Sequence, residues 1–224
     1  TTDYLGSNKS IHEFASRMKD AGFDTALWCE QWDGGYLYAP EEVANIDRIF
    51  SGLGIRIRDV HASEGEHYGQ WVSPDEAERK KGVNLVLNRV EMASDLGAQT
   101  IVLHAPHHEM PWEKGPRAYH DTMERSLGEI TEVAGQKGVS VALENCDWRG
   151  PGLMDNFPSI EFALTKFDND LVGICYDSGH GNLMRTKSGD HIGRMDETKD
   201  RLHALHLHDN KGRGATTPEK RDKL

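Results

Sequence analysis

Six apolar runs in this chain each end on a side chain that can bind a divalent cation. The terminal residues are Glu30, His61, His104, Glu144, Asp177 and His206. Carboxylate oxygens and imidazole nitrogens together suit a hard or borderline divalent cation. Donors that lie far apart in the chain, but at equivalent positions of a repeated unit, indicate a catalytic metal site if the fold gathers the run ends on one face.

The segments between these runs predict the fold that would gather them. Successive run ends are 29 to 43 residues apart, which is about the length of one strand, one helix and two loops. Apolar residues recur at helical spacing in the intervening segments. We expect helices over residues 11–22, 41–54, 74–97, 117–137, 158–167 and 191–202. Alternating strands and helices predict repeated βαβ units and a parallel α/β sheet.

The fold class expected from this pattern is a (β/α)8 TIM barrel. Most of the runs are continuously apolar, as is typical of strands covered on both faces. Six strands are visible and a complete barrel needs eight, so the first and last strands are expected to be missing from this sequence. The chain is interpreted as one domain over residues 1–224. Strict alternation would place Arg56 and Arg58 on the side of the sheet that faces the helices, and His61 on the other side.

Composition narrows the class of protein. Hydrophobic residues make up 37% of the 224 residues and charged residues 28%, a composition typical of foldable globular domains. No run approaches the roughly 18 apolar residues of a membrane helix, and no signal-peptide pattern is visible. We therefore expect a cytoplasmic protein without a membrane partner. The net charge of −11 disfavours nucleic acid, and dinucleotide and P-loop motifs are absent.

The three cysteines are Cys29, Cys146 and Cys175. They form no CxxC pair, and a sparse, odd count argues against a disulfide framework. We interpret them as small buried apolar residues, because free cysteine is among the most buried residue types.

The strongest chemical candidates are three run ends and one neighbouring histidine. Glu144 ends an apolar run, where an uncompensated carboxylate would be costly, although a Glu that caps or forms a salt bridge is the alternative. Asp177 and His180 form a D-x-x-H pair that can direct two donors into one cavity, and an ordinary Asx turn is its alternative. Strand alternation favours His206 over His208 as a ligand.

His61 and His104 are candidate ligands of a second metal ion. A single histidine at a strand end is more often a hydrogen-bonded core residue, but two at matching strand ends beside other donors make ligation an equal alternative. Aromatic residues, Trp112 among them, gather in the segments after the strands. They either pack over the barrel mouth or form a platform for a sugar ring.

Short motifs in a fixed order resemble those of the xylose isomerase-like TIM-barrel superfamily. They are VHAS from Val60, VLHAP from Val102, LENCD from Leu143, DSGHGN from Asp177 and HLHDNKG from His206. In its isomerases and epimerases the resemblance implies one metal ion, commonly Mn, Mg or Co, held here by Glu144, Asp177 and His206. The fourth ligand, a second Glu, has no counterpart. In its endonuclease IV-like members, three zinc ions also use histidines that match His61, His104 and His180.

The leading hypothesis is a metal-dependent sugar or sugar-phosphate isomerase or epimerase that works through an enediolate-type proton transfer. The cation would act as a Lewis acid, and Glu144 would be both ligand and acid/base. His180 would hold a substrate hydroxyl, and Lys211 or Arg213 would meet a phosphate. A small-molecule substrate and a possible homo-oligomer complete this hypothesis.

Two alternatives stay open. One is an endonuclease IV-like zinc phosphodiesterase acting at abasic DNA sites, which the histidines permit. Residues 62–74 contain no Lys or Arg, however, and phosphate contacts would need a basic rim. The other is a non-catalytic barrel that binds a sugar or a metal ion.

Overall fold

The structure is a computed structural model, and it describes residues 10–29, 35–62, 70–104, 115–146, 156–184, 196 and 198–207. Its helices are α1 (Ile11–Asp20), α2 (Pro40–Gly52), α3 (Glu76–Asp95), α4 (Gly115–Gln136), α5 (Phe157–Lys166) and α6 (Ser178–Met184). Its strands are β1 (Thr25–Trp28), β2 (Arg56–His61), β3 (Thr100–His104), β4 (Ser140–Glu144), β5 (Val172–Asp177) and β6 (Leu202–His206). Two 3-10 turns, η2 (Gln70–Val72) and η3 (Lys199–Arg201), complete the list.

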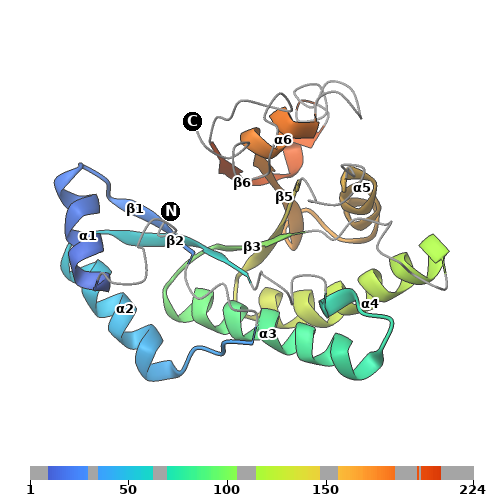
Figure 1. The fold of residues 1–224 in the computed structure, drawn as a ribbon, viewed down its shortest axis with the longest axis horizontal. Helices are drawn as coiled ribbons and strands as arrows, with labels where there is room; N and C mark the ends of the chain where they lie inside the picture. Colours follow the sequence, from blue (N-terminus) through green and yellow to red (C-terminus); the bar gives the residue numbers. More distant parts are fainter. Residues whose placement is uncertain are drawn as a thin grey trace, which may run out of the picture.

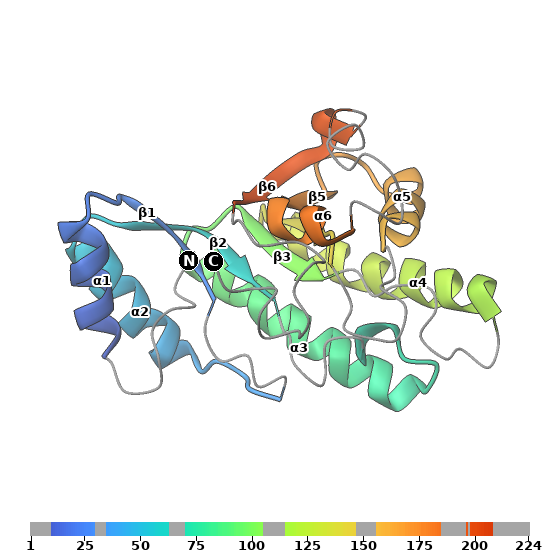
Figure 2. The ribbon, with the colours of Figure 1, turned by 45° about the horizontal axis from the view of Figure 1, so that its top comes forward.

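The strands form one parallel sheet in the order β1-β2-β3-β4-β5-β6, which is also their order along the chain (Figure 1). The sheet curls into a half-barrel, with helices along its outer side (Figure 2). The expected parallel α/β barrel architecture is therefore confirmed over six strands. Because all six strands run the same way, their carboxyl ends lie along one edge, where barrel enzymes carry their active sites.

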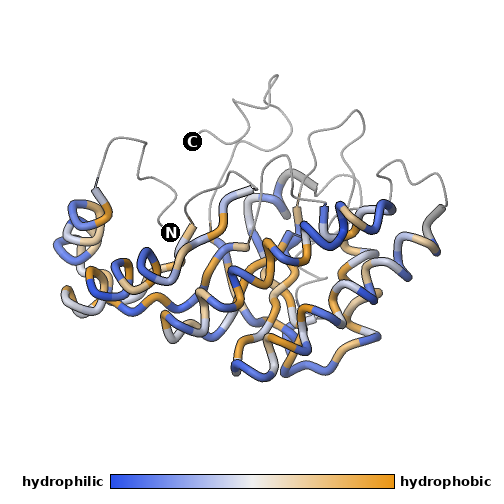
Figure 3. Tube along the Cα trace, turned by 90° about the horizontal axis from the view of Figure 1, so that it is seen from below, coloured by the Kyte–Doolittle hydropathy of each residue, from blue (hydrophilic) through white to orange (hydrophobic). Residues whose placement is uncertain are grey.

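The apolar core lies between the sheet and the helices. Alternate strand residues such as Ile101, Leu103, Val141 and Leu143 are fully buried on the helix side. A smaller apolar layer lines the inner side of the curve and contains Val102, Ala142 and Cys175, with Leu27 and Ala204 against it. Figure 3 shows the hydrophobic residues running along the strands and on one side of the helices. Inward-facing residues of adjacent strands thus share one side of the sheet.

The turns from helix to strand use glycine in a left-handed conformation. Gly97 follows α3 and Gly138 follows α4, each with φ of 68°. A side chain would be strained at this φ. These turns end each helix so that the next strand enters the sheet in register.

A β-bulge in β2 corrects the expected placement of Arg56 and Arg58. The pairing with β1 runs from Ala26–Ile57 directly to Leu27–Asp59, so that Arg58 has no partner opposite it. Ile57 and Val60 consequently both pack into the helix-side core, and both arginines are exposed. The expectation failed because a bulge shifts the alternation by one residue and re-aims the side chains that follow it.

Two expectations for the last third of the chain need revision. The helix expected over residues 191–202 falls mostly outside the described residues, and its described end is the turn η3 followed by β6, which begins at Leu202. The segment after Asp177, where no helix was expected, forms the short helix α6. Within the described parts of the chain, no helix combines the length and the apolar character needed to cross a membrane.

Candidate metal centre

The described run ends meet at the carboxyl edge of the sheet. His104 pairs with Glu144 across β3 and β4, and Asp177 pairs with His206 across β5 and β6. Glu144 and Asp177 are almost fully buried, and the histidines at these strand ends are buried or half-buried. Spatial convergence of these side chains is therefore a property of the fold, as expected from their equivalent positions.

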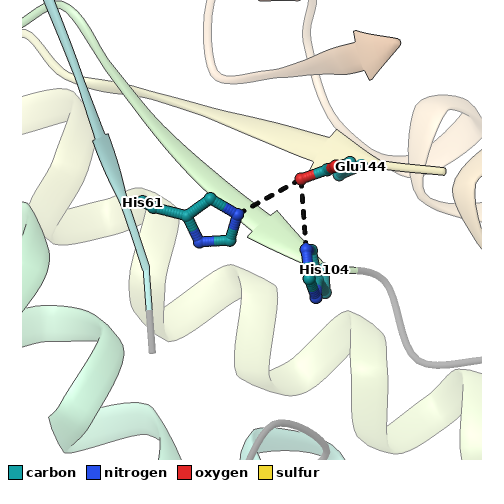
Figure 4. A group of neighbouring side chains, drawn as sticks. All are labelled: His61, His104 and Glu144. Carbon is teal, nitrogen blue, oxygen red and sulfur yellow. Dashed lines mark hydrogen bonds and ion pairs between the residues drawn. The ribbon is translucent and has the colours of Figure 1, made fainter. Parts of the chain in front are cut away.

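The carboxylate of Glu144 lies at the centre of the group and is 1% exposed. Its Oε2 is 3.3 Å from Nε2 of His61 and 3.2 Å from Nε2 of His104 (Figure 4). Its Oε1 is 3.2 Å from Nδ1 of His206 and 3.3 Å from Nδ1 of His180. One buried carboxylate is thus surrounded by four imidazole rings, two on each oxygen. We call these five residues the Glu144 cluster.

The protonation states of this cluster are linked. Burial raises the pKa of Glu144, but the charge and hydrogen bond of His104 and the hydrogen bonds of His180 and His206 outweigh it and hold the pKa well below its ordinary value. Burial lowers the pKa of His180, but the hydrogen bond to Glu144 and the charge of Asp177 raise it to about 9. The carboxylate is therefore ionised and attracts positive charge to its surroundings.

The tautomer of His61 also favours positive charge beside Glu144. Its Nδ1 lies 3.0 Å from the carbonyl oxygen of Ala62. A carbonyl only accepts hydrogen bonds, so Nδ1 carries a proton and donates it. In the neutral ring Nε2 then presents a lone pair to Oε2 of Glu144. Two electron-rich atoms 3.3 Å apart need a proton or a cation between them.

Asp177 extends the cluster toward β5. Its Oδ1 accepts a hydrogen bond of 2.6 Å from the backbone amide of His180. Its Oδ2 is 3.8 Å from Nδ1 of His206, which also faces Glu144. Asp177 and Glu144 therefore approach the same ring nitrogen of His206 from two strands.

Two buried asparagines hold the backbone beneath the cluster. Asn156 donates to the carbonyl of Glu144 at 2.9 Å and accepts from the amide of Cys146 at 3.1 Å. Asn145 bonds with both backbone groups of Asp177. Sequence reasoning missed the positioning role of both. Asn145 carried one usable signal, its place directly after Glu144 at a strand end, whereas Asn156 is 12 residues from Glu144 in the sequence and carried none.

The remaining candidates from the sequence cannot be placed beside the cluster. Glu30, Trp112, His208, Lys211 and Arg213 lie outside the described residues. The other six candidates are described, and the fold brings them together: Glu144, His180, Asp177, His206, His61 and His104.

The donor set can hold a divalent ion. Three groups of described side chains each place their donor atoms within 4.8 Å of one another. They are His61 with His104 and Glu144, Cys146 with Glu144 and His180, and Cys175 with Glu144 and His206. Imidazole and carboxylate together suit Zn, Mn or Co better than they suit an all-oxygen ion such as Ca.

The fold and this cluster define the class of protein: it is a parallel α/β barrel with a centre rich in histidine and carboxylate side chains at the carboxyl ends of its strands. The chain belongs to the xylose isomerase-like TIM barrel family, whose model matches residues 15–221. The resemblance seen in its motifs is thereby confirmed.

Two curated relatives span most of the chain. "Uncharacterized protein y4fM" of Sinorhizobium fredii is 26% identical over 225 residues, covering 92% of this chain and 70% of the relative. "Uncharacterized protein MJ1311" of Methanocaldococcus jannaschii is 26% identical over 206 residues, covering 91% of this chain and 68% of the relative. Neither name states an activity.

Solved structures with the same fold include sugar epimerases. A D-tagatose 3-epimerase-like protein matches with a TM-score of 0.72 and 22% identity, over 88% of this chain and 72% of that one. The 3-keto-D-glucoside 4-epimerase YcjR from E. coli matches with a TM-score of 0.71 and 19% identity, over 93% and 77%. At these identities the likeness shows the fold alone.

Proposed function

We propose that this chain carries the metal centre of a sugar or sugar-phosphate isomerase or epimerase. The observation that carries the proposal is the pair of imidazole nitrogens, from His61 and His104, that face one oxygen of the buried Glu144 carboxylate. A divalent cation satisfies this arrangement, because nitrogen lone pairs and a carboxylate oxygen are all ligands for it. Membership of a family whose solved relatives include epimerases supports the reaction class.

The residues present fit such an ion on both sides of Glu144. In the proposed centre Oε1, together with Asp177 and His206, would hold the ion that serves the substrate. Oε2, together with His61 and His104, would hold a second one. Nε2 of His206 is buried and has no hydrogen-bond partner among the described residues, so this ring is held only by its other nitrogen until a ligand or the rest of the chain contacts it.

A bound divalent ion supplies Lewis acidity, which stabilises negative charge on a sugar's carbonyl oxygen when the neighbouring carbon loses a proton. The chain's own side chains would supply the rest of an enediolate-type proton transfer. Glu144 is ionised and can accept or orient that proton. His180, with a pKa of about 9, is protonated at neutral pH and would donate a hydrogen bond to a substrate oxygen. Burial of the Glu144 carboxylate limits competition from water.

The substrate assignment extends to residues outside the described part of the chain. Lys211 and Arg213 would bind a phosphate if the sugar carries one, and Trp112 would pack against the sugar ring. We therefore propose both free and phosphorylated ketoses as substrates. We also propose that the protein assembles as a homo-oligomer.

Loss of a carbon-bound proton to solvent tests this proposal without knowledge of the product. The protein, loaded with Mn, Co or Zn, is incubated in D2O with a panel of ketoses and ketose phosphates, and exchange next to the carbonyl is followed by NMR. Wild type is expected to catalyse exchange and Glu144→Gln to lose it. The matched control is Glu132→Gln, on the exposed side of α4. Metal binding without exchange on any sugar would instead support the non-catalytic barrel.

One observation favours a second candidate, an endonuclease IV-like phosphodiesterase. His61 and His104 lie on the Oε2 side of Glu144 and His206 on the Oε1 side, so that Glu144 could bridge two ions. Bridged metal pairs are typical of phosphodiester hydrolysis. Cleavage of a duplex with one abasic site, compared with an intact duplex, tests this candidate. The net charge of −11 argues against tight DNA binding.

A further inference from the structure

Cys146 lies at the mouth of the half-barrel, beside the Glu144 cluster. It follows Glu144 by two residues, just beyond the end of β4, and its sulfur lies within 4.8 Å of donor atoms of Glu144 and His180. Its side chain is 7% exposed. The cysteines were interpreted as buried apolar residues, and all three are buried. The thiol of Cys146, however, is buried among groups that can bind a metal ion, so its chemistry is not limited to apolar packing.

The backbone fixes the position of the Cys146 side chain. Its amide donates to Oδ1 of Asn156 at 3.1 Å, and the same asparagine holds the carbonyl of Glu144. The thiol donates a long hydrogen bond of 3.5 Å to the carbonyl oxygen of Glu144. This weak contact is easily exchanged for a stronger one, because sulfur is a poor hydrogen-bond donor but a strong metal ligand as thiolate.

Cys175 provides the contrast within the same site. Its sulfur also comes within 4.8 Å of Glu144 and His206. However, Cys175, which pairs with Glu144 across β4 and β5, is fully buried in the inner apolar layer with Val102 and Ala142. Packing against these side chains accounts for Cys175 as a small core residue, whereas Cys146 lies just beyond the end of β4.

We propose that Cys146 is a thiolate ligand of an ion at the Glu144 cluster, acting with Glu144, and that it gives the centre a preference for zinc-class ions over magnesium. This inference rests on the proposed function, because it names the metal class of the same centre. As the sulfur–metal bond forms, the S–H bond breaks and its proton leaves to solvent. Donor atoms around one tetrahedral zinc lie roughly 3.3 to 3.8 Å apart, so closure requires side-chain shifts of about 1 Å.

The consequence is a selectivity that oxygen and nitrogen donors alone would not give. Thiolate ligands favour Zn and other soft or borderline ions, whereas Mg prefers oxygen. Even outer partners of a metal site contribute about ten- to a hundred-fold in affinity. A direct ligand is therefore expected to change the ratio of Zn to Mg affinity by at least about ten-fold.

Cobalt substitution tests the inference. A thiolate bound to Co(II) produces a charge-transfer band in the near ultraviolet, separate from the visible bands that report cobalt binding of any kind. We expect both signals in wild type and in Cys175→Ser, and only the visible bands in Cys146→Ser. Cobalt binding without the charge-transfer band in wild type would overturn the inference and leave the proposed function intact. No cobalt binding at all would overturn both.

A second measurement needs no variant and so is independent of folding. X-ray absorption of the zinc-loaded wild-type protein is expected to show one sulfur neighbour at about 2.3 Å. A shell of nitrogen and oxygen alone would contradict a thiolate ligand. Retention of the cobalt charge-transfer band in Cys146→Ser together with its loss in Cys175→Ser would assign the sulfur to Cys175 and overturn the choice of Cys146.

Discussion

The side chain of Asn145, which directly follows β4, binds the backbone of Asp177 at the end of β5 through two hydrogen bonds. Its Oδ1 accepts from the amide of Asp177 at 2.7 Å, and its Nδ2 donates to the carbonyl at 3.0 Å. Both residues are buried. Asn145 therefore fixes the position of the Asp177 backbone relative to Glu144, and the geometry of the cluster depends on this asparagine.

Replacement of Asn145 tests this positioning role. Asn145→Ala leaves a buried amide and a buried carbonyl of Asp177 without their partner, so the free energy of unfolding is expected to fall by about 2 to 3 kcal/mol. Zinc affinity is expected to fall by about ten-fold or more, because the support of a ligand is lost. Chemical denaturation and zinc titration measure the two effects. The control Asn169→Ala removes an exposed asparagine with one backbone contact, and an equal loss of affinity there would refute the positioning role.

A close approach of α3 to the η2 turn leads to a prediction about glycine. A methyl group at Gly82 would lie 2.2 Å from the backbone nitrogen of Trp71 and 2.4 Å from the carbonyl carbon of Gln70. Gly82→Ala is therefore expected to cost about 3 kcal/mol, because backbone must move. Gly128, on α4, has nothing within 4 Å of the same position.

Gly128→Ala is the matched control for Gly82→Ala. It is expected to stabilise the protein by about 0.5 to 1 kcal/mol, since alanine is the better helix former. Urea denaturation of both variants measures the difference. Equal stability of the two variants would show that α3 and η2 are not packed as described.

The half-buried imidazole of His203 leads to a prediction about pH. It packs against Gly173, where an added methyl group would lie 2.4 Å from the ring. Burial lowers the pKa of His203 below its ordinary value of 6.5, and the charge of Arg201 acts in the same direction. The folded state thus binds this proton less readily than the unfolded state. This contribution to stability is therefore lost as the pH falls through 6.5 toward the lowered pKa.

His203→Gln removes that contribution. Between pH 7 and pH 5, the variant is expected to lose less stability than wild type, as judged from urea midpoints at both values. His12→Gln, an exposed histidine on α1, serves as the comparison and is expected to follow wild type. A steeper loss of stability in the His203 variant would contradict the sign of this effect.

The sequence was sufficient to predict the strands that position the site. Strands β3, β4 and β5 end at the residues expected from their apolar runs, because each run is short and continuous and ends at a polar residue. Their equivalent spacing also predicted that Glu144 and Asp177 would converge with the histidines. Convergence follows from the parallel sheet alone, so it needs no knowledge of side-chain packing.

Features that depend on pairing between strands were not predictable in this way. The bulge at Arg58 shifts the side-chain alternation within β2, but it arises from the register with β1. The contacts of Asn156 with Glu144 and Cys146 join residues that are 12 and 10 positions apart in the sequence. The place of Cys146 within the cluster likewise follows from three-dimensional packing, since a lone cysteine has no spacing pattern to identify it.

Zinc binding by wild type and Glu144→Gln is the most direct test of the central claim, that Glu144 is the focus of a divalent metal centre. The protein is stripped with a chelator, dialysed against zinc and analysed for metal per chain, with Glu132→Gln as the control. We predict at least one zinc ion per chain in wild type and in the control, and a loss of about a hundred-fold or more in affinity in Glu144→Gln. Equal zinc content and affinity in wild type and Glu144→Gln would contradict the account.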